Sequence, residues 1–147
     1  MAIWHVRPTL EELHAWDRET MSEFIGIEYI EIGDDFLRAR MPVDRRTCQP
    51  MGLLHGGASL VLAETVGSVA ANHCVDRQRL RCVGLEINAN HTRSARSGWV
   101  IGTARPAHIG RTTQVWEIRI EDQAGRLTCL SRLTMAVVPV PKKGSAL

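Results

Sequence analysis

The sequence has few lysines, few aromatic residues and no long apolar run. Only Lys142 and Lys143 are lysines among the 18 basic residues, and the formal net charge of the 147-residue chain is +2. Aromatic residues make up 5% of the chain, and the basic residues form no run, so no nucleic-acid partner is expected. The longest apolar stretch, residues 58–63, contains a serine and ends at Glu64. It is far too short to span a bilayer, so no membrane partner is expected.

The cysteines and histidines show no spacing that is typical of a metal or disulfide site. No pair among Cys48, Cys74, Cys82 and Cys129 has CxxC spacing, and the scattered histidines form neither HxxxH nor HExxH. The N-terminus, MAIWHVRPTLEE, has no apolar core of a signal peptide. We therefore expect reduced thiols, a cytoplasmic location, and neither a metal nor a cofactor.

The pattern of the first third predicts one helix and a hairpin. Thr9 and Glu12 form a capping-box signature, and the helix that follows is expected to end near Met21. Residues 24–32 and 36–43 are expected to be strands around a Gly-Asp-Asp turn. Residues 44–54 are expected to be a loop.

The rest of the chain predicts a buried helix followed by four strands. Residues 55–72 are apolar on nearly every side, which indicates a buried helix, and Gly67 and Ala71 would let another backbone approach closely. The expected strands are residues 82–91, 99–107, 112–120 and 127–138. This order predicts an α+β hotdog fold, an antiparallel sheet wrapped round one long central helix, as a single domain over residues 1–138 with a loose tail over 139–147.

Glu64 is the first candidate for chemistry. It lies in the middle of the apolar helix, where a buried carboxylate costs several kcal/mol, on the order of 3–5, unless it is paired or neutralised. Proteins rarely keep such a group without a role. The alternative is that Glu64 and Ser68, four residues later on the same face, form a narrow solvated stripe. Ser59 does not lie in a G-x-S-x-G elbow, and no cysteine is placed beside a histidine by a motif, so neither is expected to be a nucleophile.

The start of the same helix is the second candidate. His55-Gly56-Gly57 would bring backbone N–H groups and the positive end of the helix dipole close to a ligand. Such a position suits an oxyanion, although the glycines could simply permit a tight entry into the helix. Gln49 lies in the preceding loop and could donate a second hydrogen bond to a carbonyl oxygen.

Two polar segments are candidate phosphate contacts. His91, Arg93, Ser94 and Arg96 crowd the end of one expected strand, and residues 108–113 form a polar turn. In that turn, Gly110, Arg111 and Thr112 would offer backbone N–H groups and a guanidinium to a diphosphate. Either segment could instead be a solvated strand end.

Three segments together resemble a known family. They read TCQPMGLLHGGASLVLAETVGSVA, VGLEINANHTRSAR and AHIGRTTQVW. They are similar to the hotdog-fold acyl-CoA thioesterases with a catalytic glutamate. The nearest types are the 1,4-dihydroxy-2-naphthoyl-CoA hydrolases and then the glutamate type of 4-hydroxybenzoyl-CoA thioesterase. The likeness extends from about Ile3 to Val138. Met51 stands where the family often has Phe, and would give a softer wall if it borders the acyl pocket.

The resemblance implies a role for each matching residue. Glu64 corresponds to the catalytic carboxylate, Gln49 and the Gly56 N–H to the groups that polarise the thioester carbonyl, and His55 and Ser68 to residues of the reaction site. The implied contacts with the substrate and its CoA portion are Gly84, His91, Thr92, Arg93, Ser94, His108, Ile109, Gly110, Arg111, Thr112 and Thr113. The family is cytoplasmic and free of metal, and is built as dimers that pair into tetramers.

The expected activity is hydrolysis of an acyl-CoA, with an aromatic acyl group, to the free acid and CoA. Glu64 would act as nucleophile or as general base. Gly56 and Glu64 are eight residues apart, roughly 12 Å along a helix, so a site shared between two subunits is expected. The alternatives are a hotdog hydratase or dehydratase, which would need a histidine acid/base, and a non-catalytic acyl-CoA-binding protein, which would not need Glu64.

Overall fold

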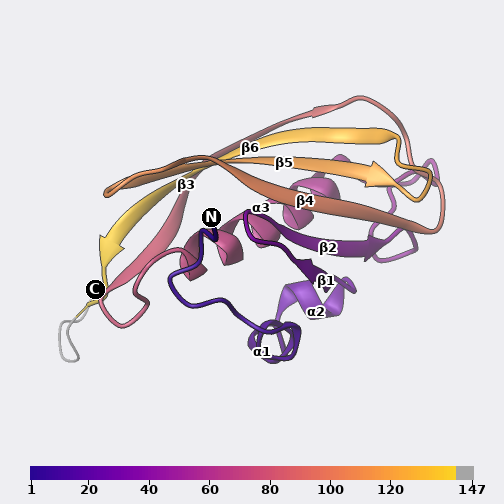
Figure 1. Cartoon of the computed structure of the whole chain (residues 1–147). Helices are drawn as coiled ribbons and strands as arrows, with labels where there is room; N and C mark the ends of the chain where they lie inside the picture. Colours follow the sequence, from indigo (N-terminus) through magenta and orange to yellow (C-terminus); the bar gives the residue numbers. More distant parts are fainter. Residues whose placement is uncertain (142–147) are drawn as a thin grey trace.

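The computed structural model describes residues 1–141 and has one long helix lying in the concave face of a curved sheet (Figure 1). The helix is α3 (Gly56–His73), and every sheet pairing is antiparallel. The strand order is β1-β2-β4-β5-β6-β3. The strands are β1 (Glu28–Ile32), β2 (Leu37–Pro42), β3 (Leu80–His91), β4 (Trp99–Ile109), β5 (Thr113–Asp122) and β6 (Leu127–Pro139). The predicted hotdog fold is confirmed. Within residues 1–141, no helix is both long enough and apolar enough to cross a membrane.

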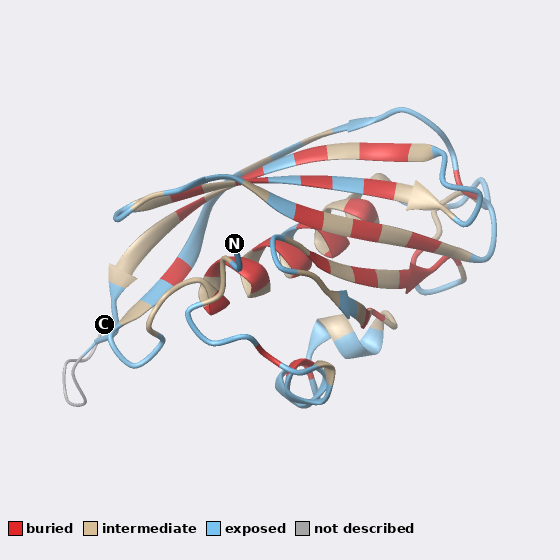
Figure 2. Ribbon diagram, in the orientation of Figure 1, coloured by how far each residue is buried: buried red, intermediate tan, exposed pale blue. Residues whose placement is uncertain are grey.

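The core lies between α3 and the inner face of the sheet. On β5 the alternation places Trp116, Ile118 and Ile120 inward, and all three are fully buried (Figure 2). Gly67 of α3 meets this face, because an added Cβ there would lie 2.8 Å from Leu133 Cδ2. The close approach expected at Gly67 is therefore to side chains of the chain's own sheet, and the expectation of another backbone there is wrong.

The N-terminal third differs from its prediction. The expected helix is two short ones, α1 (Leu10–Trp16), which has the predicted capping box at Thr9, and α2 (Met21–Phe24). They are separated because Glu19 has a φ of 61°, a left-handed conformation that no helix continues through. The strand predicted from Phe24 begins only at Glu28.

All four later strands extend beyond their predicted bounds at one end, and β5 also begins one residue later than predicted. β6 extends to Pro139, and the Val140 N–H donates to the Arg79 carbonyl at 2.9 Å. The prediction of a loose tail that begins at residue 139 is therefore wrong for residues 139 and 140, because both pair with the chain at the start of β3. The remainder of the expected tail, residues 142–147, lies outside the described residues.

β3 is an edge strand, and the backbone hydrogen-bonding groups along its outer edge have no partner strand among residues 1–141. Within the described chain it pairs only with β6. Leu85 is 63% exposed, and the register with β6 shifts between Gly84 and Glu86, which is a β-bulge. A long edge strand with exposed apolar side chains is a surface on which a second strand can add.

The N-terminal segment packs against the end of α3. The His5 N–H donates to the His73 carbonyl at 2.9 Å, and Trp4 Nε1 donates to the Gly33 carbonyl at 2.8 Å. His73 is thereby buried, and Arg77 Nη1 lies 3.4 Å from its Nε2. Burial lowers the pKa of His73 below its ordinary 6.5, and the Arg77 charge lowers it further, against smaller opposing effects of Glu12 and the Val6 backbone. His73 is therefore held in its neutral form.

A buried neutral histidine makes stability depend on pH. Because the unfolded chain binds the His73 proton more readily, the free energy of unfolding should fall as pH drops below about 6.5. One proton corresponds to at most about 1.4 kcal/mol per pH unit. His73→Gln should remove this contribution, giving a shallower slope between pH 7.5 and 5.5 in chemical denaturation. Every other titrating group is common to both proteins, so equal slopes would show that His73 is not the group responsible.

Candidate active site

The histidine and glycines at the start of α3 form its N-terminal cap. His55 Nδ1 accepts the Gly57 N–H at 2.8 Å, so the imidazole itself satisfies one of the first backbone donors of the helix. A Cβ at Gly57 would lie 3.0 Å from that Nδ1. Glycine at position 57 therefore leaves room for the capping ring, and Nδ1 is occupied by a structural hydrogen bond.

Gly56 stands beneath a second imidazole. A Cβ at Gly56 would lie 3.0 Å from His91 Nε2 at the end of β3, so a side chain there would collide with that ring. The Gly56 N–H forms no hydrogen bond with any residue of the described chain. The exposed end of the helix thus presents one free backbone donor beside His91, at the positive end of the helix dipole.

Gln49 is held in the loop that precedes α3. Its Oε1 accepts the Met51 N–H, and its backbone N–H donates to the Leu53 carbonyl at 2.8 Å. A backbone hydrogen bond fixes the end of this loop, since the Leu54 N–H donates to the Ala95 carbonyl at 2.8 Å. With Oε1 engaged, the side-chain NH₂ of Gln49 remains available as a donor.

These groups share one pocket of about 330 Å³. Its lining includes the predicted site residues Gln49, Gly56, His91, Thr92, Arg93 and Ser94. Two of the predicted elements, the helix start and the end of β3, are thus brought together by the fold.

Glu64 is exposed, so the expectation of a buried carboxylate is wrong for the single chain. The sheet leaves part of α3 uncovered, and Glu64 lies exposed beside the edge strand β3, in keeping with the solvated-stripe alternative. Its carboxylate lies against β3, because a Cβ at Gly84 would be 2.9 Å from Glu64 Oε1. Glycine at the β3 bulge therefore makes room for the carboxylate. Ser68, one turn later, is half-buried.

The turn between β4 and β5 offers fewer donors than the sequence indicates. The Gly110 N–H donates to the Thr113 carbonyl at 2.9 Å and closes the turn, so it is not free for a diphosphate. The His108 ring packs on Gly110, where a Cβ would lie 2.5 Å from His108 Nε2. Ile109, Arg111 and Thr112 are exposed, and the guanidinium of Arg111 remains as the charged group of this turn.

The predicted residues fall into two groups at opposite ends of the sheet. Thr92 bonds to the Thr128 carbonyl near one end of β6, whereas the Thr112 carbonyl accepts from Val137 near the other. Nine residues of strand separate the two points, roughly 30 Å. Gly84 pairs with Met135 and Thr113 with Ala136, so Glu64, Gly84 and the residues 108–113 share the second end. Gly56 and Glu64 are themselves eight residues apart on α3 (64 − 56), roughly 12 Å along its axis, so one chain does not bring Glu64 to Gln49 and Gly56.

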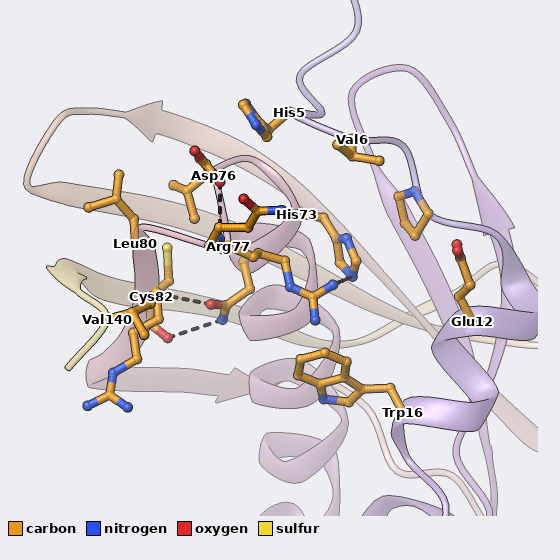
Figure 3. Close-up of a pocket in the computed structure, with 15 residues that line it drawn as sticks. His5, Val6, Glu12, Trp16, His73, Asp76, Arg77, Leu80, Cys82 and Val140 are labelled. Carbon is orange, nitrogen blue, oxygen red and sulfur yellow. Dashed lines mark hydrogen bonds between the residues drawn. The ribbon is translucent and has the colours of Figure 1, made fainter. Parts of the chain in front are cut away.

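Sequence reasoning missed a second hollow, of about 810 Å³, at the far end of α3 (Figure 3). Trp16 of α1, His73 and Arg77 line it together with the N-terminal segment and the start of β3. Arg77 stacks on Trp16, its Cζ lying 4.0 Å from the ring centroid. No local sequence pattern links these residues. The only feature of the sequence that indicates a site here is Trp16, a tryptophan on the exposed side of a short helix in a chain with few aromatic residues.

The other nucleophile types are poorly placed. Ser59 is buried within α3. All four cysteines are free thiols, and burial raises the pKa of Cys74 to about 12 and that of Cys82 to about 11, with the charge of Cys82 adding to the first. A thiol with such a pKa is protonated at neutral pH and is a weak nucleophile.

Comparison with known proteins places the chain in a family. The model of the Thioesterase superfamily matches residues 51–129. The 1,4-dihydroxy-2-naphthoyl-CoA hydrolase of Escherichia coli K12 is 55% identical over 136 residues, which cover 92% of this chain and 99% of the relative.

Solved structures agree in fold as well as in sequence. The crystal structure of the mutant thioesterase PA1618 (Q49A) from Pseudomonas aeruginosa is 51% identical, with a TM-score of 0.93, covering 95% of this chain and all of the other. A mutant thioesterase of Staphylococcus aureus is 36% identical with a TM-score of 0.78, over 81% of this chain and 98% of its own. The chain belongs to the Thioesterase superfamily and is a thioester hydrolase with the hotdog fold.

Proposed function

We propose that the chain hydrolyses aromatic acyl-CoA thioesters at sites shared between two copies of itself. The separation of the predicted residues into two groups carries this proposal. Gln49, Gly56 and His91 stand at one end of the sheet, and Glu64 stands at the other beside Gly84. A two-fold axis that sets two α3 helices antiparallel would bring the first group of one copy to the second group of its partner.

The edge of β3 supports such a pairing. It is unpaired within the described chain, and it carries Glu64's neighbour Gly84 as well as the exposed Leu85. Pairing of two β3 strands would cover these apolar side chains and complete the backbone hydrogen bonds of the edge. The proposal extends to a dimer of dimers and to a cytoplasmic location, the latter in keeping with four free thiols.

In the completed site, each group has a defined task. The Gln49 NH₂ and the Gly56 N–H donate to the thioester oxygen as negative charge develops on it. The partner's carboxylate, at position Glu64, either attacks the carbonyl carbon or takes a proton from an attacking water. Attack by the carboxylate breaks the C–S bond, releases CoA and leaves a mixed anhydride that water hydrolyses. Ser68 lies one turn beyond and would hold the water.

Relatives support both the substrate class and the two residues. One relative at 55% identity is a 1,4-dihydroxy-2-naphthoyl-CoA hydrolase, which acts on an aromatic acyl-CoA. The Staphylococcus aureus protein was crystallised with a glutamate and with a glutamine replaced by alanine, at positions fifteen apart (47 − 32), and Gln49 and Glu64 are also fifteen apart (64 − 49).

The first prediction concerns the carboxylate. Glu64→Gln keeps the size of the side chain but removes its charge and basicity, so kcat should fall on the order of a hundredfold or more. Because Glu64 is exposed, the variant should unfold at the same denaturant concentration as the wild type. Release of free thiol from benzoyl-CoA and naphthoyl-CoA measures kcat. A Glu64→Gln enzyme with near wild-type turnover would refute the mechanism.

The second prediction concerns the nucleotide end of CoA. Arg93 lines the pocket at the helix start and Arg111 lies on the β4–β5 turn, and each is a candidate phosphate contact. Replacing either by Ala should raise KM more than it lowers kcat, because phosphate binding is equal in the ground and transition states. The effect should disappear with a pantetheine thioester that lacks the nucleotide. Arg132→Ala, on an exposed position of β6, is the matched control. An equal penalty with both thioesters would contradict the assignment.

The third prediction tests the sharing of the site. Gln49→Ala and Glu64→Ala are each expected to be inactive, but a mixed dimer would contain one doubly altered site and one intact site. Random pairing after co-refolding should then restore about a quarter of wild-type activity. If both residues served one chain's own site, every mixed dimer would carry a defect in each site. Background activity in mixtures whose mixed dimers are demonstrated by mass spectrometry would therefore exclude a shared site.

A further inference from the structure

A small pocket next to the hollow at the end of α3 reaches Ser68, which lies one turn beyond Glu64. A small pocket of about 70 Å³ is lined by Ser68, Trp16, Asn72 and Arg77, among others. The large hollow of about 810 Å³ has Trp16, Asn72 and Arg77 in its lining as well. The two are therefore adjacent at these residues, and the lining of the small pocket extends from Ser68 to Arg77.

Most polar groups at this junction are already engaged. The Asn72 side chain donates to the carbonyls of Ser68 and Cys82 and accepts the Cys82 N–H at 2.8 Å, which binds α3 to β3. Glu12 accepts the Thr9 N–H in the capping box, and neutral His73 accepts from Arg77. These side chains shape the junction but have little capacity left for a ligand.

Arg77 is the exception. It forms no ion pair with any described residue, yet its position is fixed by the face of Trp16 and by His73 (Figure 3). A guanidinium has five N–H donors, of which His73 takes one. A cation that is held in place before a ligand arrives loses little conformational entropy on binding an anion.

We infer that Arg77, held by Trp16, is a specificity-determining residue that selects aromatic acyl groups carrying a carboxylate at the end remote from the thioester. The inference rests on the proposed function, since it takes Glu64 as the point of attack. A carboxylate can accept two parallel hydrogen bonds from the guanidinium, and an aromatic ring before it would lie beside Trp16 and Val69.

The positions of Glu64, Ser68 and Arg77 set the order in which an acyl group would meet them. Glu64 and Ser68 are one helical turn apart, roughly 6 Å. Ser68 and Arg77 then line the same small pocket. The inference is therefore tested with acyl groups of one ring and of two fused rings, each with its carboxylate on the far side from the thioester.

The test compares matched acyl-CoAs that differ only at the remote end. The substrates are 4-carboxybenzoyl-CoA and 6-carboxy-2-naphthoyl-CoA, each against its methyl counterpart. With wild-type enzyme, at least one carboxylated member is expected to have a higher kcat/KM than its methyl partner. Arg77→Met should lower kcat/KM for that carboxylated member by about tenfold or more, mainly through KM, because a charge-assisted hydrogen bond is lost. The value for the methyl partner should change by less than about twofold.

Two further variants separate selectivity from structure. Arg77→Lys keeps a charge without the planar fork and should restore part of the preference for the carboxylate. Arg79→Gln changes an exposed arginine that does not line either cavity of the described chain, and should leave both values unchanged.

Each outcome has one meaning. A wild-type enzyme that prefers the methyl compounds, or an Arg77→Met variant that changes both members of a pair equally, would overturn the assignment of Arg77. Under either result, Glu64-dependent hydrolysis would leave the proposed function intact. If wild-type enzyme hydrolyses none of the four thioesters, or if Glu64→Gln hydrolyses them as well as wild type, the proposed function fails, and the role of Arg77 fails with it.

Discussion

The structure depends on the fact that the sheet covers α3 on one side only. The buried side of the helix packs on Trp116, Ile118 and the other inward side chains of the sheet, and this contact fixes the position and direction of α3. The uncovered side then presents Glu64 to solvent at mid-helix, while the helix start presents the Gly56 N–H. The apolar contact therefore determines the positions of both groups that the proposed mechanism uses, although neither takes part in it.

Glycine marks the places where functional side chains approach the backbone. At Gly56, Gly57 and Gly84 an added Cβ would lie about 3 Å from His91, His55 and Glu64 respectively. A larger residue at Gly84 would displace the carboxylate that the proposed mechanism uses, and one at Gly56 or Gly57 would displace a ring beside the start of α3. Burial does not distinguish the Glu64 carboxylate, because it is exposed, whereas its contact with Gly84 places it against β3.

The sequence predicts those parts of the molecule that have a local cause. The alternation of β5 follows from Trp116, Ile118 and Ile120, and the capping box at Thr9 is formed as predicted. The environment of Glu64 could not be predicted, because an apolar helix pattern does not say which side a sheet covers. The engagement of the Gly110 N–H could not be predicted either. Its hydrogen bond to the Thr113 carbonyl depends on the conformation of the turn, which the sequence does not specify.

The residues proposed for the reaction and those proposed for substrate selectivity differ in the same way: the first are local in the sequence, and the second meet only through tertiary contacts. Gln49, Gly56 and Glu64 lie within one loop and one helix, so their spacing along the chain carries information about their joint task. Trp16 and Arg77 come from elements sixty-one residues apart (77 − 16) and meet only because the N-terminal segment is anchored to the end of α3. A change in the short helix α1 would therefore alter the end of the proposed acyl pocket without disturbing the proposed reaction centre. Differences in substrate among chains of this fold should thus be sought in such tertiary contacts, and the shared reaction in the helix.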